Sequence, residues 1–206
     1  MIIGLSGYAK SGKDTVADII SDLQPDIWDI RKFSGKLKQI ASILTGIPEA
    51  KFEDQEFKQS LLGQEWRKYG EDHDTKTAWI RPMYVRDFLQ LLGTDAVRNG
   101  LHQNAWVNAL MADYKATVTQ PVKFGGTAIG EYPNWVITDV RFPNEAQAIK
   151  DRGGVIVRID RPGVKPVNAH PSETALDNWD FDYKIANASD LVALQQSVEV
   201  LLNKIS

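Results

Sequence analysis

Residues 1–23 constrain the fold of this chain more than any other stretch. The apolar run 2–5 leads into a glycine-rich turn, "SGYAKSGK", and a helical pattern follows it. The recurring apolar positions are Val16, Ile19, Ile20 and Leu23, which lie on one face of a helix, and Pro25 follows as a stop. The stretch therefore predicts a strand, a tight loop and a helix.

Strand and helix patterns alternate along the rest of the chain, which predicts an α/β fold with a parallel sheet covered by helices. The predicted strands are residues 2–6, 27–33, 135–139, 155–160 and 183–186. Apolar residues also repeat at helical spacing over 85–92 and 191–205, with Ser189 as the expected N-cap of the second helix. We interpret these stripes as faces packed on the core.

The composition limits the classes of protein to consider. With 206 residues, 43% of them hydrophobic, the chain is expected to form a single domain, 1–206. No apolar run approaches the ~20 residues of a membrane span, and the start of the chain lacks the pattern of a secretory signal. The absence of cysteine favours a cytoplasmic location. The net charge of −3 disfavours a broad nucleic-acid-binding face.

A long insertion separates the second and third predicted strands. Residues 34–134, about 100 in number, exceed a simple crossover, so we expect a mainly helical lobe with helices at 57–70 and 104–114. The Gly- and Pro-rich stretch 119–133 predicts a loop or a hairpin, and "RPGVKPVNAHPSE" predicts a lid at about 161–175.

The glycine turn has the G-x-x-x-x-G-K spacing of a phosphate-binding loop, formed by Gly7, Gly12 and Lys13. Glycines let the backbone N–H groups wrap around an anion, and the helix that follows directs its positive end at the same point. The alternative is a chance glycine turn, but the strand before it and the helix after it favour phosphate binding. The residues expected to hold the phosphates are Gly7, Tyr8, Ala9, Lys10, Ser11, Gly12, Lys13, Asp14 and Thr15.

Asp14 stands where such loops usually have the hydroxyl that holds Mg²⁺. A carboxylate is a hard oxygen ligand that Mg²⁺ accepts directly or through water, so we predict a metal role for Asp14. The alternative is that Asp14 is simply favourable in the first turn of a helix. Thr15 then supplies a hydroxyl to phosphate.

Asp139 ends an apolar strand in "NWVITDVRFPNEAQAI", the position of the second Mg²⁺ partner in phosphate-loop enzymes. Helix capping is the alternative role for Asn144 and Glu145.

Several separate arginines suggest an acceptor that is itself a phosphate, because two anionic groups must be neutralised to approach each other. They are Arg86, Arg98, Arg141, Arg158 and Arg161. A GTPase is disfavoured, since no N-K-x-D signature is present.

Longer strings in the chain resemble the phage-type deoxynucleoside monophosphate kinases, a P-loop family. The strings, in order, are "GYAKSGKDT", "RDFLQLLGTDAVR", "WVITDVRFPNEAQAI", "VIVRIDRPG" and "HPSETALD". The resemblance implies a three-layer α/β/α fold with a parallel five-stranded sheet, an acceptor-binding lobe and a lid. It also implies Mg²⁺-dependent transfer of the γ-phosphoryl of ATP to a dNMP, giving ADP and dNDP, in the host cytoplasm if a phage encodes the chain.

The resemblance also implies roles for single residues. Lys13, Asp139, Arg141 and Arg161 are expected to be catalytic, with Asp14 and Asp139 at the metal. Asn187 is expected near the adenine of ATP, while His170, Ser172 and Glu173 match a lid motif. The residues expected to bind the acceptor are Phe33, Lys38, Arg86, Gln90, Arg98, Arg141 and Glu145.

Two alternatives remain open from the sequence. One is another P-loop kinase of a small phosphorylated acceptor, such as phosphomevalonate or dephospho-coenzyme A. The other is a nucleotide-dependent switch or ATPase with no acceptor. A homodimer is neither indicated nor excluded.

Overall fold

The computed structural model describes residues 1–118, 130–166 and 171–205. The chain forms two compact units, one of Met1–Phe33 with Val107–Ser206 and the other of Ser34–Trp106. The expected insertion 34–134 is therefore divided, because its last part belongs to the first unit.

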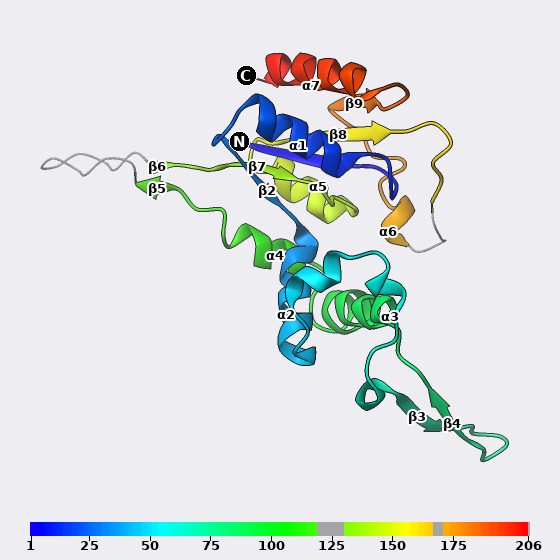
Figure 1. The fold of residues 1–206 in the computed structure, drawn as a ribbon. Coiled ribbons are helices and arrows are strands. Elements are labelled where there is room, and N and C mark those ends of the chain that lie inside the picture. Colours follow the sequence, from blue (N-terminus) through cyan, green and yellow to red (C-terminus); the bar gives the residue numbers. More distant parts are fainter. Residues whose placement is uncertain (119–129, 167–170, 206) are drawn as a thin grey trace, which may run out of the picture. The chain divides into compact units, whose positions relative to one another are not determined.

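The first unit is built on a five-stranded parallel sheet with the strand order β2-β7-β1-β8-β9 (Figure 1). The strands are β1 (Ile2–Ser6), β2 (Trp28–Arg31), β7 (Asn134–Ile137), β8 (Val155–Asp160) and β9 (Tyr183–Ala186). Ile3 of β1 pairs with Val136 on one side and Val155 on the other. The glycine loop thus leaves the central strand at the carboxyl edge of the sheet, where α/β proteins bind ligands. This confirms the predicted α/β fold class.

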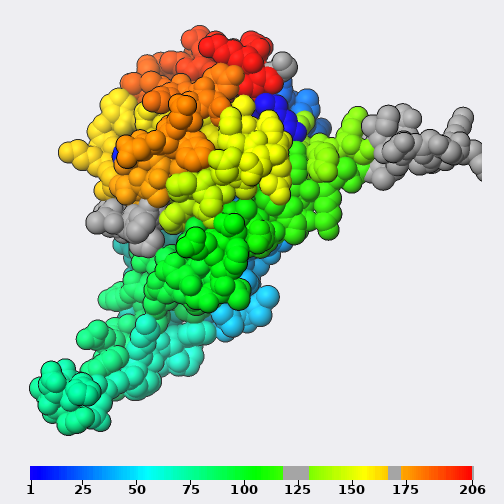
Figure 2. All heavy atoms as spheres, turned by 180° about the vertical axis from the view of Figure 1, so that it is seen from behind, coloured from blue at the N-terminus to red at the C-terminus, as the bar shows by residue number. Residues whose placement is uncertain are grey.

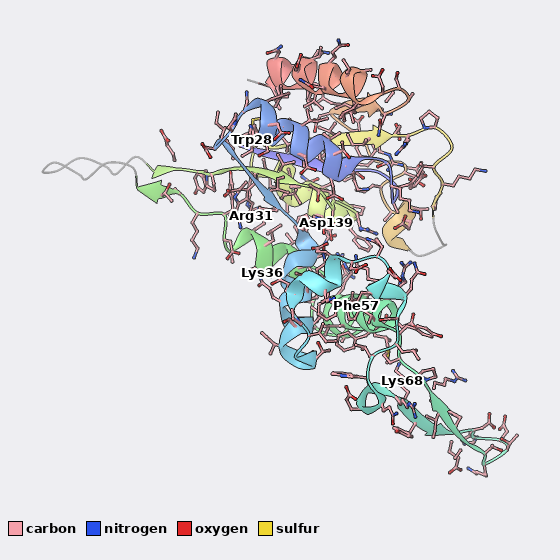
Figure 3. All side chains as sticks on the ribbon, viewed as in Figure 1. Trp28, Arg31, Lys36, Phe57, Lys68 and Asp139 are labelled. Atoms are coloured by element: carbon pink, nitrogen blue, oxygen red, sulfur yellow. The ribbon has the colours of Figure 1, made fainter. Side chains whose placement is uncertain are left out.

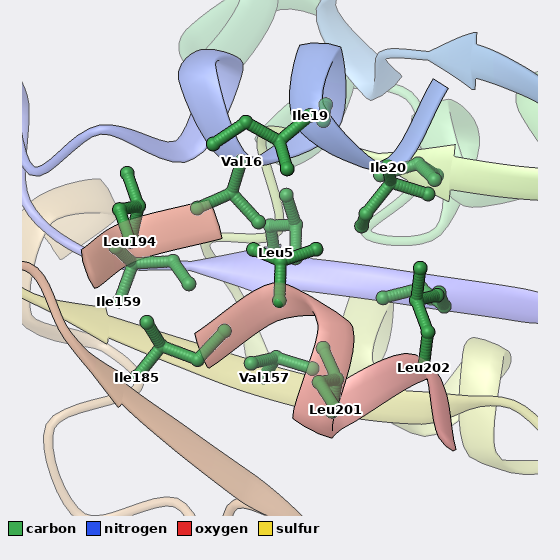
Figure 4. Close-up of a cluster of buried hydrophobic side chains, with 14 residues drawn as sticks. Leu5, Val16, Ile19, Ile20, Val157, Ile159, Ile185, Leu194, Leu201 and Leu202 are labelled. Carbon is green, nitrogen blue, oxygen red and sulfur yellow. The ribbon is translucent and has the colours of Figure 1, made fainter. Parts of the chain in front are cut away.

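Helices cover both faces of this sheet. On one face, α1 (Lys13–Leu23) and α7 (Leu191–Ile205) enclose a cluster in which Leu5, Val16 and Leu201 are buried (Figure 4). On the other face, α5 (Pro143–Lys150) and the end of α4 (Ala105–Met111) pack with Ile2 and Trp135. Neighbouring residues of β1 point to opposite faces, so both apolar clusters depend on the same strand.

The predicted strands agree closely with the observed ones. β1, β8 and β9 have the predicted bounds, whereas β2 and β7 are shorter, and Figure 3 labels Trp28 and Arg31 on β2. The predicted N-cap of α7, Ser189, is wrong. Asp190 takes that role, because its carboxylate accepts a hydrogen bond from Ala193 N at 2.9 Å.

The second unit combines helical turns with a hairpin. Most of α2 (Phe33–Thr45) lies in it, and β3 (Lys68–Glu71) pairs antiparallel with β4 (Ala78–Arg81). Its other elements are η1 (Glu49–Glu53), η2 (Phe57–Gln59), η3 (Gln64–Trp66), α3 (Val85–Gln90) and the π-helix η4 (Leu91–Asn99). Its core is a cluster that includes Phe52, Val85 and Phe88.

The helix predicted at 57–70 is therefore wrong. Only two short 3-10 turns form there, and residues from Lys68 onward pair with β4 instead. Local spacing of apolar residues could not reveal that pairing, because the partner strand lies further along the chain. The helix predicted at 104–114 is confirmed in a shorter form by α4.

Two further regions were expected to be a loop or hairpin, at 119–133, and a lid, at about 161–175. β5 (Thr117–Val118) and β6 (Gly130–Glu131) form an antiparallel pair on either side of 119–129, which agrees with the hairpin alternative. Residues 119–129 and 167–170 lie outside the described part of the chain, and α6 (Pro171–Thr174) follows the second gap. Within the described residues, no helix combines the length and apolar character of a membrane span.

Leu201 offers a direct test of the first apolar cluster. Leu201→Ala is expected to lower the free energy of unfolding by about 2–5 kcal/mol, because it leaves a cavity between α7 and the sheet. Val200→Ala is the matched control, since Val200 is 54% exposed on the same helix. Urea denaturation of both variants measures the difference, and equal losses would contradict this packing.

Candidate active site

The loop from Gly7 to Gly12 wraps tightly against neighbouring strands. A Cβ on Gly7 would lie 2.5 Å from the Ile159 carbonyl oxygen, and one on Gly12 would lie 2.5 Å from Asn187 Nδ2. Gly12 also has a φ of 102°, in the left-handed region that favours glycine. Glycine at both positions is therefore required for the loop to take this path.

Ser11 lies inside this loop and is 1% exposed. Its Oγ has no hydrogen-bond partner among the described residues. A buried hydroxyl without a partner is costly unless a ligand or water satisfies it. This atom is the first indication that the loop is shaped for a polar ligand.

Lys13 begins α1, and its ammonium group folds back over the loop. Nζ donates to the carbonyl oxygens of Gly7 and Tyr8, each at 2.8 Å. Burial, reinforced by the charge of Arg141, lowers the pKa of Lys13 to about 8, although Asp14, Glu173 and Asp139 act in the opposite sense. The loop, Lys13, Arg141 and three carboxylates are thus gathered in one electrostatic environment.

Asp14 is paired with a cation that the sequence reasoning missed. Lys32 Nζ lies 3.1 Å from Asp14 Oδ1. Partial burial acts to raise the pKa of Asp14, but the hydrogen bond and charge of Lys32, together with Thr138 and the charge of Lys13, outweigh it and leave that pKa below its usual range. The only signal in the sequence was that Lys32 follows β2 directly, since residues after parallel strands gather at one edge of the sheet.

Asp139 lies just beyond the end of β7, at the start of α2 (Figure 3). Its Oδ1 accepts a hydrogen bond from Phe33 N at 2.7 Å. The Phe33 side chain is 3% exposed and packs in the second apolar cluster. Phe33 therefore fixes Asp139 through its backbone, while its expected contact with the acceptor stays a prediction.

Arg141 is oriented by two glutamates. Its Nη1 lies 2.8 Å from Glu173 Oε1, and its backbone N donates to Glu145 Oε2, also at 2.8 Å. Phe142 N donates to the same Glu145 oxygen at 3.1 Å. The capping alternative for Glu145 is thus observed, whereas substrate binding by this residue stays a prediction.

Glu173 keeps one oxygen free of protein partners. Its Oε2 is buried without a hydrogen bond among the described residues. Asp14 and Asp139 supply hard oxygen ligands, and Mg²⁺ commonly combines one or two carboxylates with water and phosphate oxygens. These donors fit a magnesium ion. Among the described residues, no group of three or more acidic, His or Cys side chains forms a cage for a metal.

Asn187 and Arg161 both approach the loop. Asn187 Nδ2 donates to the Ser11 carbonyl oxygen at 2.9 Å, and Arg161 Nη1 lies 3.5 Å from the Lys10 carbonyl oxygen. The sequence placed Asn187 near adenine, and the structure shows its amide supporting the loop. His170 and the side chain of Ser172 lie outside the described part of the chain.

The residues expected to bind the acceptor mostly lie in the second unit. Lys38 is 6% exposed and pairs with Glu53. Arg86 and Gln90 are half-buried on α3, and Arg98 is half-buried on η4. π-helical turns often occur at functional sites, but the roles of these residues stay predictions.

A glycine loop after the central strand, a lysine at the start of the following helix and an acidic residue beyond a neighbouring strand together define a P-loop nucleotide-binding protein. A sequence model of the deoxynucleotide monophosphate kinase family matches residues 64–198. The chain therefore belongs to the deoxynucleotide monophosphate kinase family, whose members are phosphotransferases. This confirms the resemblance.

Similar proteins support the assignment over most of the chain. A protein of Acanthamoeba polyphaga mimivirus named as a deoxynucleotide monophosphate kinase is 30% identical, over 85% of this chain and 82% of its own. The deoxynucleoside-5'-monophosphate kinase of Escherichia phage T5 is 26% identical, over 92% of this chain and 90% of its own. The deoxynucleotide monophosphate kinase of Enterobacteria phage T4 is 29% identical, over 56% of this chain and 44% of its own.

The role of Glu145 can be measured by its removal. Glu145→Ala is expected to destabilise the fold by about 1–3 kcal/mol, because it leaves two backbone N–H groups without their acceptor. Glu199→Ala on the exposed face of α7 is the control. Denaturant unfolding gives both values. A Glu145→Ala protein as stable as the native chain would contradict the capping role.

Proposed function

We propose that the chain is a deoxynucleoside monophosphate kinase that transfers the γ-phosphoryl of ATP to a dNMP, giving ADP and dNDP. The observation that carries this proposal is the phosphate loop with Lys13, Asp14, Asp139 and Arg141 gathered around it in a member of this family. Their charges suit phosphoryl transfer, in which the protein chiefly positions and neutralises anions.

The loop from Gly7 to Thr15 holds the phosphates of ATP. Backbone N–H groups at the start of α1 point to the anion, and the positive end of that helix adds to the attraction. Lys13 exchanges the carbonyl oxygens of Gly7 and Tyr8 for phosphate oxygens when ATP binds. The unpartnered Ser11 hydroxyl gains a partner at the same time.

Asp14 and Asp139 hold Mg²⁺, directly or through water. Bound there, the ion neutralises charge on the β- and γ-phosphates. Lys32 already pairs with Asp14, so it keeps this carboxylate ionised and oriented before nucleotide arrives. Phe33 N orients Asp139 through its hydrogen bond.

The acceptor needs no general base. A phosphate monoester has a second pKa of ~6 and is a dianion near neutral pH, so one of its oxygens attacks the γ-phosphorus directly. The bond between that phosphorus and the oxygen that bridges the β- and γ-phosphates breaks, and ADP leaves with this oxygen. Arg141, oriented by Glu173, offsets the repulsion between the two nucleotides, while Arg161 closes over the loop.

The second unit supplies the acceptor contacts in this proposal. Arg86 and Arg98 bind the dNMP phosphate, Gln90 reads an edge of the base, and Lys38 and Phe33 also contact the acceptor. Glu145 contributes by holding the backbone of Arg141. The support for these roles is the match of the sequence strings to the family and the half-buried position of the three polar side chains on α3 and η4.

A panel of acceptors tests the function. ADP formation, followed by a coupled assay with ATP and Mg²⁺, is expected to require a dNMP and to differ between bases. Ribonucleotides, phosphomevalonate and dephospho-coenzyme A serve as comparison acceptors. Turnover of none of the nucleoside monophosphates, or ATP hydrolysis at full rate without an acceptor, would overturn the proposal.

The pH dependence tests the role of Lys13. Because its pKa is lowered to about 8, the ammonium loses its proton as the pH rises through about 8, and kcat/KM for ATP is expected to fall there. Lys204→Ala, an exposed lysine on α7, should leave this limb unchanged. A profile that stays flat up to about pH 10, near the ordinary lysine pKa, would contradict the assignment.

A further inference from the structure

Tyr8 connects the phosphate loop to a part of the protein that the proposed mechanism does not use. Its carbonyl oxygen accepts a hydrogen bond from Lys13, while its side-chain hydroxyl donates to Asp177 Oδ1 at 3.0 Å. The backbone of Tyr8 thus lies at the phosphate site, and its side chain is fixed by a residue far away in the sequence.

A buried arginine packs against the face of the Tyr8 ring. Arg158 of β8 is 8% exposed, and its guanidinium carbon lies 4.6 Å from the centre of the Tyr8 ring. The same carbon lies 5.6 Å from the centre of the Phe181 ring. A desolvated guanidinium over an aromatic face is attracted by the ring electrons, so Tyr8 is held by its face as well as by its hydroxyl.

The charge of Arg158 is balanced by two carboxylates. Nε lies 3.1 Å from Asp160 Oδ1, and Nη2 lies 3.4 Å from Asp177 Oδ1. Burial, followed by the hydrogen bond and charge of Asp177, raises the pKa of Tyr8, so the hydroxyl remains a donor. Asp177 therefore links a loop residue to a strand residue within one network.

The segment that carries Asp177 is itself anchored. Leu176 is 3% exposed in the second apolar cluster, and Glu173 pairs with Arg141. Further along, Asp182 accepts from Ile156 N at 2.7 Å and pairs with Lys150 of α5. In Figure 2 this segment, in orange, lies against the yellow surface of α5. Asp177 is thus held in place by its neighbours, so its hydrogen bond to Tyr8 can restrain the loop.

We propose that Tyr8, Arg158 and Asp177 form a positioning cluster that fixes the phosphate loop in its nucleotide-binding shape. The cluster deepens the proposed function and rests on it. Its side chains act through the loop backbone, because the Tyr8 carbonyl carries the contact to Lys13. The Tyr8 backbone belongs to the loop that holds the phosphates, but the three side chains contact one another and Asp160, so Arg158 is not among the arginines that neutralise phosphate in this proposal. Loosening the cluster weakens ATP binding while the chemical step on bound substrates is largely kept.

Two substitutions separate the contacts of the cluster. Tyr8→Phe keeps the ring over Arg158 and removes only the hydroxyl donor. Asp177→Asn keeps an acceptor for that hydroxyl but loses the charge that faces Arg158, and Asp177→Ala loses both. Arg158 is left intact, because it is buried and packs on both the Tyr8 and the Phe181 ring, so its removal would also take away packing.

Hydrogen exchange in the nucleotide-free protein is the first measurement. Tyr8→Phe and Asp177→Ala are expected to speed amide exchange in residues 7–12 without changing exchange in β1. The matched control is Tyr183→Phe, which removes a hydroxyl from β9 with no hydrogen bond among the described residues. Exchange rates in the loop that equal those of the native protein would overturn the proposal.

Steady-state kinetics are the second measurement. Tyr8→Phe and Asp177→Ala are each expected to raise KM for ATP about three- to tenfold, with kcat within about twofold and KM for dNMP unchanged. Asp177→Asn should have a smaller effect. The double variant should resemble the larger single one, because both changes remove the same hydrogen bond. Fully additive effects, or a loss confined to kcat, would contradict the cluster.

The two measurements separate this inference from the proposed function. If loop exchange rises as expected but no dNMP is phosphorylated, the cluster stands and the proposed function falls. If the native protein phosphorylates dNMPs while Tyr8→Phe changes neither exchange nor KM for ATP, the cluster alone falls.

Discussion

The close approach of the glycine loop to the ends of the neighbouring strands is the constraint on which the rest of the site depends. Gly7 meets the backbone of Ile159, and Gly12 meets the amide of Asn187, with no room for a side chain at either point. This path turns the first N–H groups of α1 toward one spot and brings Lys13 back over the loop. The proposed anion site is therefore formed mainly by backbone groups, with side chains at its edge.

The charged side chains around the loop influence one another electrostatically. Burial and the nearby charge of Arg141 lower the pKa of Lys13, and the charges of three carboxylates partly offset this lowering. Asp14 and Asp139 are each occupied by a donor of the protein, Lys32 Nζ for one and Phe33 N for the other. An acid in place of the usual hydroxyl is thus no defect. In the proposed mechanism it is an oxygen ligand for Mg²⁺, and Lys32 orients and neutralises it before the metal and the phosphates bind.

Much of the first unit could be predicted from sequence because its signals are local. Strands of β-branched residues and a glycine loop in G-x-x-x-x-G-K spacing specify the sheet and the phosphate site without knowledge of distant partners. The second unit was harder. The hairpin of β3 and β4 depends on pairing between separate stretches, and the apolar spacing at 57–70 resembled a helix.

Site contacts that join distant segments were likewise hidden. Lys32 reaches Asp14 from the end of β2, and Asp177 reaches Tyr8 from beyond α6, and neither pair is close in sequence. The helix-capping contact of Glu145 was foreseeable, since an acid three residues into a helix is a known capping pattern. Sequence thus indicated which chemistry is present, whereas the folded chain was needed to show which groups orient it.

This site is proposed to pass a phosphoryl group from ATP to a nucleoside monophosphate. Incubation with γ-labelled ATP, Mg²⁺ and a mixture of dNMPs, followed by separation of the products, tests it most directly. The label is expected in the β-phosphate of a dNDP, and Lys13→Ala is expected to abolish most of this transfer while the protein stays folded. Label found only in inorganic phosphate, or transfer undiminished in Lys13→Ala, would contradict it.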